Sequence, residues 1–189
     1  PDVKIDLDTD TLELDGKPLL IQKHLYLMLN KPSGVLSAAR DPKQPTVLDL
    51  VPETYRRSGL FPAGRLDKDT EGFVLITDDG EFAHSILSPK HHVPKTYHAR
   101  IDGPLTEQMV EEFAAGVVLE DGVTCNPAQL SVLENGEQPL CQVILTQGMY
   151  HQVKRMFWPL AAESSGLSAL RSAGFYWIMH CSQENRAKF

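Results

Sequence analysis

The segment GRLDKDTEG holds five charged side chains between two glycines, directly before the apolar run FVLIT. These side chains are Arg65, Asp67, Lys68, Asp69 and Glu71. A structured turn accounts for part of this charge, because carboxylates and hydroxyls in turns hydrogen-bond the nearby backbone. By that reasoning Asp69, Thr70 and Glu71 hold the turn open. An ionised carboxylate presented by a rigid turn can also act as a nucleophile or a base, so one of these groups is a candidate for chemistry.

Other sequence patterns that carry chemistry are missing. The chain has no GxxxxGK[ST] phosphate loop, no G-x-S-x-G nucleophile turn and no H-E-x-x-H zinc motif. His91 and His92 are adjacent, so their side chains diverge and make poor joint metal ligands. We therefore predict no metal site. A metal-dependent hydrolase that uses Asp67, Asp69 and the histidines at positions 84, 91 and 92 is a distant alternative.

The composition is that of an ordinary soluble globular protein. The 189 residues are 42% hydrophobic and 23% charged, enough for one core or for a main domain with a small appendage. No apolar run approaches the roughly 18–20 residues that span a membrane, and the first residues lack the pattern of a signal peptide. The three cysteines are odd in number and far apart, which favours a reducing compartment without disulfides. We expect a cytoplasmic protein with no membrane partner.

The net charge is −7, but its distribution matters more for a nucleic-acid partner than its sum. Residues 1–17 hold six acids and two lysines. The segments 30–43, 89–100 and 150–155 are by contrast rich in lysine, arginine and histidine. Each segment alone fits a solvated loop. The three together, around a carboxylate-rich turn, favour a basic groove.

The elements that must position these residues follow from periodicity and turn residues. The segment 106–117 is the clearest helix, because Thr106 is an N-cap, Gly116 is a C-terminal glycine, and Met109, Val110, Phe113 and Ala114 share one face. A shorter helix fits 78–88. We predict an exposed hairpin in 3–14, strands in 25–30, 72–77, 96–102, 128–134 and 139–148, and a helix that starts in 150–157. Strands mostly lead directly to strands, so we predict an α+β fold with a mixed or largely antiparallel sheet flanked by short helices.

Four segments, LMLNKPSGVLSA, PAGRLDKDTEGFVLITDDGEFAH, SPKHHVPKTY and GMYHQVKRMF, occur in an order and spacing that resemble the RsuA-type pseudouridine synthases. That family modifies ribosomal RNA, and the resemblance covers about residues 25–157. The segment YHQVKRMF is similar to the branch that acts on 16S ribosomal RNA. Branches that act on the large subunit tend to have an Asn-Arg pair where this chain has Tyr150 and His151.

The resemblance implies a pseudouridine synthase catalytic fold and an enzyme that isomerises uridine 516 of 16S ribosomal RNA to pseudouridine. It implies no cofactor, no metal and a monomer. The partner would be 16S ribosomal RNA or a small-subunit assembly intermediate. A non-catalytic RNA-binding or ribosome assembly factor is the alternative.

The resemblance also implies roles for individual residues. Asp67 is the catalytic carboxylate, Lys154 is the cation that pairs with it, and Tyr97 stacks on the target base and helps to remove the proton from carbon 5. A lysine at position 154 contributes a point charge where many relatives have the two-pronged guanidinium of arginine. The residues implied in RNA binding are Arg65, Lys31, Lys95, His151, Gln152 and Arg155.

The chain departs from the family pattern at both ends. We expect residues 1–22 to be the remnant of an N-terminal RNA-binding domain or its linker, residues 23–157 to be the catalytic domain, and residues 158–189 to be atypical. Trp158-Pro159 should break the helix, since proline removes a hydrogen bond and clashes with the preceding turn. Permitted codons read in a shifted frame from Trp158 can spell Ala-Ala-Gly-Gly-Arg-Val-Val-Gly-Leu, which resembles the family helix. We predict that residues 158–189 are a frameshifted reading, without the last strands of the sheet.

Overall fold

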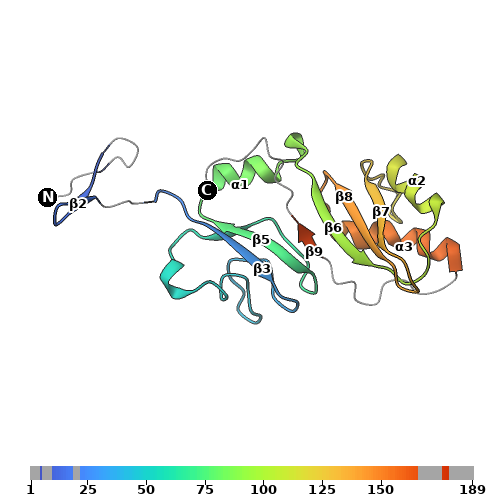
Figure 1. Cartoon of the computed structure of the whole chain (residues 1–189), viewed down its shortest axis with the longest axis horizontal. Coiled ribbons are helices and arrows are strands. Elements are labelled where there is room, and N and C mark those ends of the chain that lie inside the picture. The colour runs from blue at the N-terminus through green and yellow to red at the C-terminus, as the bar shows by residue number, and fades with distance from the viewer. Residues whose placement is uncertain (1–4, 6–9, 19–21, 166–175, 179–189) are drawn as a thin grey trace.

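The computed structural model describes all residues except 1–4, 6–9, 19–21, 166–175 and 179–189. Near the N-terminus, β1 (Glu13–Leu14) and β2 (Lys17–Pro18) form a separate antiparallel hairpin (Figure 1). Its turn is Asp15-Gly16, and both residues have positive φ, as the favoured two-residue hairpin turn requires. The hairpin predicted within 3–14 is met only at residues 13–14, because residues 5 and 10–12 form no strand and residues 3–4 and 6–9 lie outside the described residues.

The main sheet has seven strands in the order β3-β5-β9-β6-β8-β7, with β4 also paired to β5. Every pair in it is antiparallel except β5 with β9. This arrangement confirms the predicted mixed, largely antiparallel sheet. The strands are β3 (Tyr26–Lys31), β4 (Phe61–Ala63), β5 (Glu71–Thr77), β6 (Lys95–Arg100), β7 (Gln129–Glu134), β8 (Leu140–Leu145) and β9 (Tyr176–Ile178).

Strand β5 is buried on both faces, which explains its continuous apolar sequence. Val74 and Ile76 belong to a core with the loop residues between β3 and β4, whereas Leu75 packs with Ala83 of helix α1 (Gly80–Leu87). Asp79 caps α1 by accepting a hydrogen bond from the Phe82 amide. The carboxylate-rich turn at residues 64–70 leads directly into this rigid strand, as the sequence predicted.

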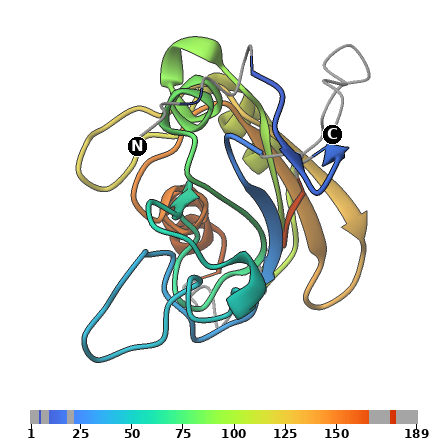
Figure 2. The ribbon, with the colours of Figure 1, turned by 90° about the vertical axis from the view of Figure 1, so that its left-hand side faces the viewer.

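The other half of the sheet packs against helices α2 (Glu107–Ala115) and α3 (Gln152–Ser165). Thr106 caps α2 through the Met109 amide, and Gly116 ends it with a φ of 101°. Met109 and Phe113 are buried as predicted, but Ala114 is exposed. In Figure 2, α3 lies against one side of the sheet. Tyr97 of β6 packs against both main cores. Short 3-10 helices occupy Glu53–Tyr55 and Pro89–His91.

Helix α3 continues through Pro159 to Ser165, so the predicted break at Trp158-Pro159 is wrong. The physical reason is burial on one side of the helix, where Val153, Met156, Phe157 and Leu160 recur at helical spacing. A proline inside a helix costs about 3 kcal/mol. Each fully buried large apolar side chain contributes about 1.5–3 kcal/mol, so the packing outweighs that cost.

Strand β9 inserts between β5 and β6, where it is parallel to β5 and antiparallel to β6. Residues 158–165 and 176–178 of the segment that we predicted to be frameshifted thus belong to α3 and β9, so the prediction that this segment supplies no strand to the sheet is wrong. The rest of that segment lies outside the described residues, and a shifted reading frame stays a prediction. Within the part of the chain that the structure describes, no helix has the length and apolar character to cross a membrane.

Candidate active site

The turn that carries Asp67 is held from both sides by the segment that follows β3. The Ser37 hydroxyl donates to the Leu66 carbonyl at 2.9 Å and accepts from the Leu66 amide at 3.0 Å. On the other side of Asp67, the Lys68 carbonyl accepts from the Gly34 amide at 2.8 Å. The backbone on each side of Asp67 is therefore fixed by hydrogen bonds to a second segment of the chain.

Lys31 adds a buried cation to this support. Its side chain is 0% exposed, and its ammonium donates to the carbonyls of Pro32 at 2.9 Å and Lys68 at 3.1 Å. Burial lowers the pKa of Lys31, and the nearby carboxylates oppose that shift. A cation enclosed in this way does not face RNA, so its position does not fit the expected RNA-binding role. The geometry instead makes Lys31 a support of the turn.

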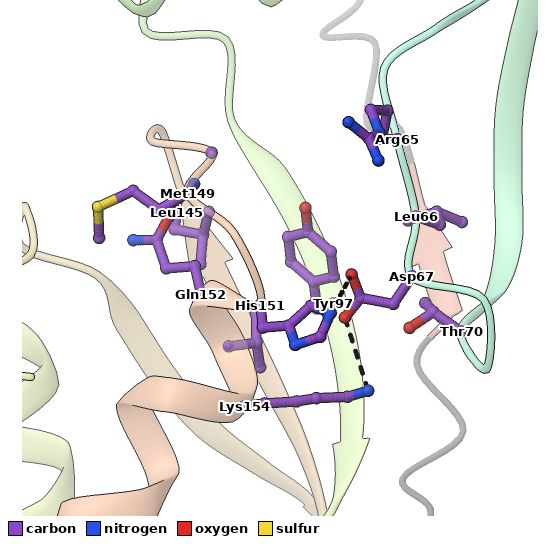
Figure 3. A pocket seen from close by; sticks show the side chains of 12 residues that line it. Arg65, Leu66, Asp67, Thr70, Tyr97, Leu145, Met149, His151, Gln152 and Lys154 are labelled. Carbon is purple, nitrogen blue, oxygen red and sulfur yellow. Dashed lines mark hydrogen bonds and ion pairs between the residues drawn. The ribbon is translucent and has the colours of Figure 1, made fainter. Parts of the chain in front are cut away.

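The Asp67 carboxylate meets two nitrogen groups from the start of α3 (Figure 3). The His151 Nε2 atom lies 3.2 Å from Asp67 Oδ1, and the Lys154 Nζ atom lies 3.5 Å from Asp67 Oδ2. The Asp67 side chain is 27% exposed, so it remains accessible from the cleft. His151 thus faces the catalytic candidate, although the sequence had placed it among RNA-binding residues.

Lys154 also binds the neighbouring carboxylate of the turn. Its ammonium lies 2.9 and 2.8 Å from the two oxygens of Asp69. Burial raises the pKa of Asp69, but the hydrogen bonds and charge of Lys154 outweigh that effect and hold the pKa below its ordinary value. Asp69 therefore shares the cation that we expected to pair with Asp67. This contact joins residues 85 positions apart, and no local signal in the sequence predicts it.

Tyr97 forms a wall of the same cleft, next to Asp67 (Figure 3). Its ring is half-buried between the two main cores. Burial, and then the charge of Asp67, raise the pKa of Tyr97 to about 12. The phenol is consequently neutral at neutral pH.

The start of α3 is ordered by Gln152, which is 5% exposed. Its side-chain oxygen accepts from the Met149 amide at 3.0 Å, and its side-chain nitrogen donates to Gln147 at 3.1 Å. The Gln147 side chain also accepts from the Asn126 amide at 3.0 Å. Gln152 is therefore enclosed by protein partners, which does not fit its expected contact with RNA. Gln147 and Ser37 were missed, since neither stands out in sequence.

The remaining cations expected to bind RNA differ in their availability. Arg65 is exposed and lines the rim of the cleft (Figure 3). Lys95 is half-buried, its pKa is lowered by that burial, and its ammonium donates to the Val93 carbonyl at 3.2 Å. Arg155 forms an ion pair with Asp121. Of these three, Arg65 is the one that the geometry places best to meet a substrate.

The cleft has a volume of about 60 Å³, opens to solvent, and has apolar and polar walls. Its lining residues are Arg65, Leu66, Asp67, Thr70, Tyr97, Leu145, Gly148, Met149, His151, Gln152, Val153 and Lys154. Among the described residues, no group of three or more His, Cys, Asp or Glu side chains is arranged to hold a metal ion. The histidines at positions 84, 91 and 92 do not line this cleft, so the metal-hydrolase alternative finds no support in this arrangement.

Comparisons with known proteins point in one direction. Residues 25–158 match the family model described as RNA pseudouridylate synthase. The chain is 45% identical over 158 residues to an uncharacterised RNA pseudouridine synthase of Bacillus subtilis, covering 82% of this chain and 66% of that protein. It is also 45% identical over 147 residues to ribosomal small subunit pseudouridine synthase A of Escherichia coli, covering 76% of this chain and 61% of that protein.

A solved structure described as a pseudouridylate synthase superimposes with a TM-score of 0.69 and 34% identity, covering 93% of this chain and 70% of that one. The fold and the sequence thus lead to the same group of proteins. The chain nevertheless spans less than two thirds of the length of the two sequence relatives above.

Proposed function

Because the chain belongs to the RNA pseudouridylate synthase family, we propose that it isomerises a uridine of small-subunit ribosomal RNA to pseudouridine. The observation that carries this proposal is the placement of Asp67. Its carboxylate projects from a hydrogen-bonded turn into a cleft, between nitrogen atoms of His151 and Lys154 at the N-terminal end of α3 and the ring of Tyr97.

The proposed reaction rearranges bonds without net gain or loss of atoms. The bond between the sugar C1′ and the base N1 breaks, the base rotates, and C1′ bonds to carbon 5 of the base. Carbon 5 loses a proton, and N1 takes one up. Asp67 is the group in the cleft suited to act as nucleophile or base, and the positive charge of Lys154 stabilises the carboxylate next to it.

The role proposed for Tyr97 is mainly to stack on the target base. A phenol with a pKa of about 12 is protonated at neutral pH, so it holds no vacant site for a second proton. It could accept the carbon 5 proton only by passing its own to a neighbour such as Asp67. Stacking between aromatic and apolar groups is the usual way in which enzymes hold a base that has left its helix.

A uridine in a folded RNA must leave its stack before Asp67 can reach it. The exposed guanidinium of Arg65 at the rim of the cleft is suited to hold the flipped nucleotide or the strand that it leaves. Phosphate contacts supply much of the affinity in such complexes and do not by themselves select the sequence. Arg65 therefore belongs to binding in this proposal, and Asp67 to chemistry.

The finer assignment is uridine 516 of 16S ribosomal RNA, in the free RNA or in a small-subunit assembly intermediate. Its support is the similarity to the small-subunit enzyme of Escherichia coli. A monomer that acts in the cytoplasm without a cofactor is part of the same proposal. Mapping pseudouridines in ribosomal RNA from cells that lack, and then regain, the gene tests the target nucleotide directly.

Release of tritium from RNA labelled at carbon 5 of uridine tests the reaction itself. We expect the protein to release tritium from unmodified 16S ribosomal RNA or its early assembly particles. Asp67→Asn should release none while binding RNA with unchanged affinity, and Asp102→Asn, the same change beyond the far end of β6, should behave like the wild type. Binding without tritium release by the wild type would favour the RNA-binding or assembly factor instead. Full turnover by Asp67→Asn would exclude Asp67 as the catalytic carboxylate.

A further inference from the structure

We propose that His151 is a positioning residue that fixes the rotation of the Asp67 carboxylate. This inference rests on the proposed function, since it gives Asp67 the catalytic part. His151 was expected to bind RNA; in this proposal it instead orients the carboxylate oxygen atoms of Asp67. The carrying observation is the 3.2 Å contact between His151 Nε2 and Asp67 Oδ1.

Lys154 alone does not determine the orientation of this carboxylate. Its ammonium lies 3.5 Å from Asp67 Oδ2 but 2.8 and 2.9 Å from the oxygens of Asp69, so its closest contacts are with the other carboxylate. The terminal torsion of an aspartate is broad, and a single long contact leaves it free to turn. A second contact on the other oxygen sets the plane of the carboxylate. His151 supplies that second contact.

The backbone of His151 is arranged to aim the ring at Asp67. Its φ is 48°, and Asp15, His92 and His151 are the non-glycine residues with positive φ in the described part of the chain. Such a conformation is uncommon outside glycine and persists where the surroundings hold it. Here the carbonyl of His151 accepts from the Arg155 amide at 2.9 Å, which is part of the first turn of α3. The conformation is thus locked to the start of that helix.

The neighbouring aromatic side chain also restricts the ring of His151. It stacks on the ring of Tyr150, with centroids 3.8 Å apart and planes 18° from parallel. In Figure 3 the imidazole of His151, directly before α3, projects toward the Asp67 carboxylate. A side chain whose backbone and ring are both held before substrate arrives can place a catalytic group with little reorganisation.

Two substitutions separate this role from a purely backbone role. Glutamine carries its side-chain nitrogen as many bonds from Cα as the Nε2 atom of histidine, so His151→Gln can keep the contact with Asp67. Asparagine is one bond shorter and cannot reach as far, but it tolerates positive φ better than other non-glycine residues. If His151 positions Asp67, His151→Gln should therefore be more active than His151→Asn. If only the positive φ of position 151 matters, His151→Asn should be the more active variant.

The single-turnover rate of tritium release and the dissociation constant of 16S ribosomal RNA are measured for each variant. We expect His151→Gln to retain at least about a third of the wild-type rate, and His151→Asn and His151→Ala to lose on the order of 100-fold, the cost of a misplaced catalytic group. The dissociation constants should stay within about twofold. His84→Gln and His84→Asn are controls, because His84 lies exposed on α1, outside the cleft and outside the basic segments, and both should keep the wild-type rate.

Three results would overturn the proposal. A higher single-turnover rate for His151→Asn than for His151→Gln would show that the backbone conformation at position 151 matters and the side-chain contact does not. Equal losses in both variants would show that the Nε2 contact is not what matters. A larger dissociation constant for 16S ribosomal RNA at an unchanged single-turnover rate would show that His151 binds RNA and does not position Asp67.

A second measurement does not depend on turnover. The ¹⁵N resonance of His151 Nε2, assigned by its loss in His151→Gln, should shift in Asp67→Asn. No shift would refute the contact, whether or not the protein makes pseudouridine. If the resonance shifts in Asp67→Asn but the wild-type protein releases no tritium, the proposed function is refuted and the contact between His151 and Asp67 is supported.

Discussion

The Lys154 ammonium lies closer to both oxygens of Asp69, at 2.9 and 2.8 Å, than to Asp67, at 3.5 Å from Oδ2. The cation expected to serve the catalytic carboxylate is therefore divided between two acids of the same turn. The Asp69 side chain is 58% exposed and that of Asp67 is 27% exposed. Since exposed ion pairs contribute little, the shorter contact need not be the more valuable one.

Lys154→Met should lower the single-turnover rate of tritium release by about 100- to 1,000-fold, a range typical for the loss of one group that stabilises charge in an active site. Asp69→Asn should lower it by no more than about fivefold, because an exposed ion pair contributes at most about 1 kcal/mol. Both rates are measured on the same labelled 16S ribosomal RNA. If the two variants lose equally, the pair of Lys154 with Asp69 is the one that activity needs.

Ser37→Ala should reduce activity more than the removal of a serine hydroxyl away from the cleft does. It removes both hydrogen bonds that hold Leu66, next to Asp67, and leaves the Leu66 amide and carbonyl without that partner. We expect a loss of about 1–3 kcal/mol in the free energy of unfolding. We also expect a fall of about tenfold in the tritium-release rate at unchanged RNA affinity, through a less well placed Asp67. Urea unfolding and single-turnover kinetics measure the two effects.

Ser85→Ala is the control for that prediction. The Ser85 hydroxyl is half-buried and donates to the Phe82 carbonyl within α1, away from the cleft. Its loss should leave the tritium-release rate unchanged. Equal rates for Ser37→Ala and Ser85→Ala would remove Ser37 from the support of Asp67.

Asp67→Asn should lower the pKa of Tyr97 from about 12, because the charge of Asp67 contributes to that raised value. The pKa should remain above 10, since burial is the larger cause. Ultraviolet titration of tyrosinate measures it, and the difference from Tyr97→Phe isolates this residue from Tyr26, whose pKa is also raised to about 12. An unchanged Tyr97 pKa in Asp67→Asn would mean that the two side chains are not electrostatically coupled.

Asp78→Asn should destabilise the fold at pH 7 and weaken its sensitivity to acid. Asp78 accepts from the Leu25 amide at 2.9 Å and pairs with Arg57, and these interactions outweigh burial and lower its pKa. A lowered pKa contributes stability above the unfolded value of about 3.8, and this stability is lost as the pH falls through the lower folded value. We expect a loss of about 1–3 kcal/mol at pH 7. Urea unfolding should give free energies of unfolding that differ between variant and wild type at pH 7 and become similar at acidic pH. An equal difference at both pH values would contradict this prediction.

Resequencing the gene tests the proposal that residues 158–189 are read in a shifted frame. The family match ends at residue 158, and Pro159 occupies the interior of α3. We expect the corrected frame to replace Trp158-Pro159 with residues that favour a helix, and the corrected protein to be more stable to urea. An unshifted frame in a stable and active protein would contradict the proposal.

The sequence by itself determined the elements whose signals are local. The caps Asp79 and Thr106 mark where α1 and α2 begin, and the continuous apolar run of β5 predicts a strand. The glycine-bounded turn before β5 likewise predicts a presented carboxylate. These signals depend on neighbours within one or two turns of chain, so a single sequence contains them.

Tertiary structure alone decided which side chains the site uses and how. Lys31 and Gln152 resemble ligands for RNA in the sequence but are enclosed by backbone and side-chain partners. Packing against the core carries α3 through Pro159 in spite of the local rule against it. The contacts of α3 with the Asp67 turn join positions more than 80 residues apart. Burial and hydrogen-bond partners depend on such distant segments, and local periodicity contains no information about them.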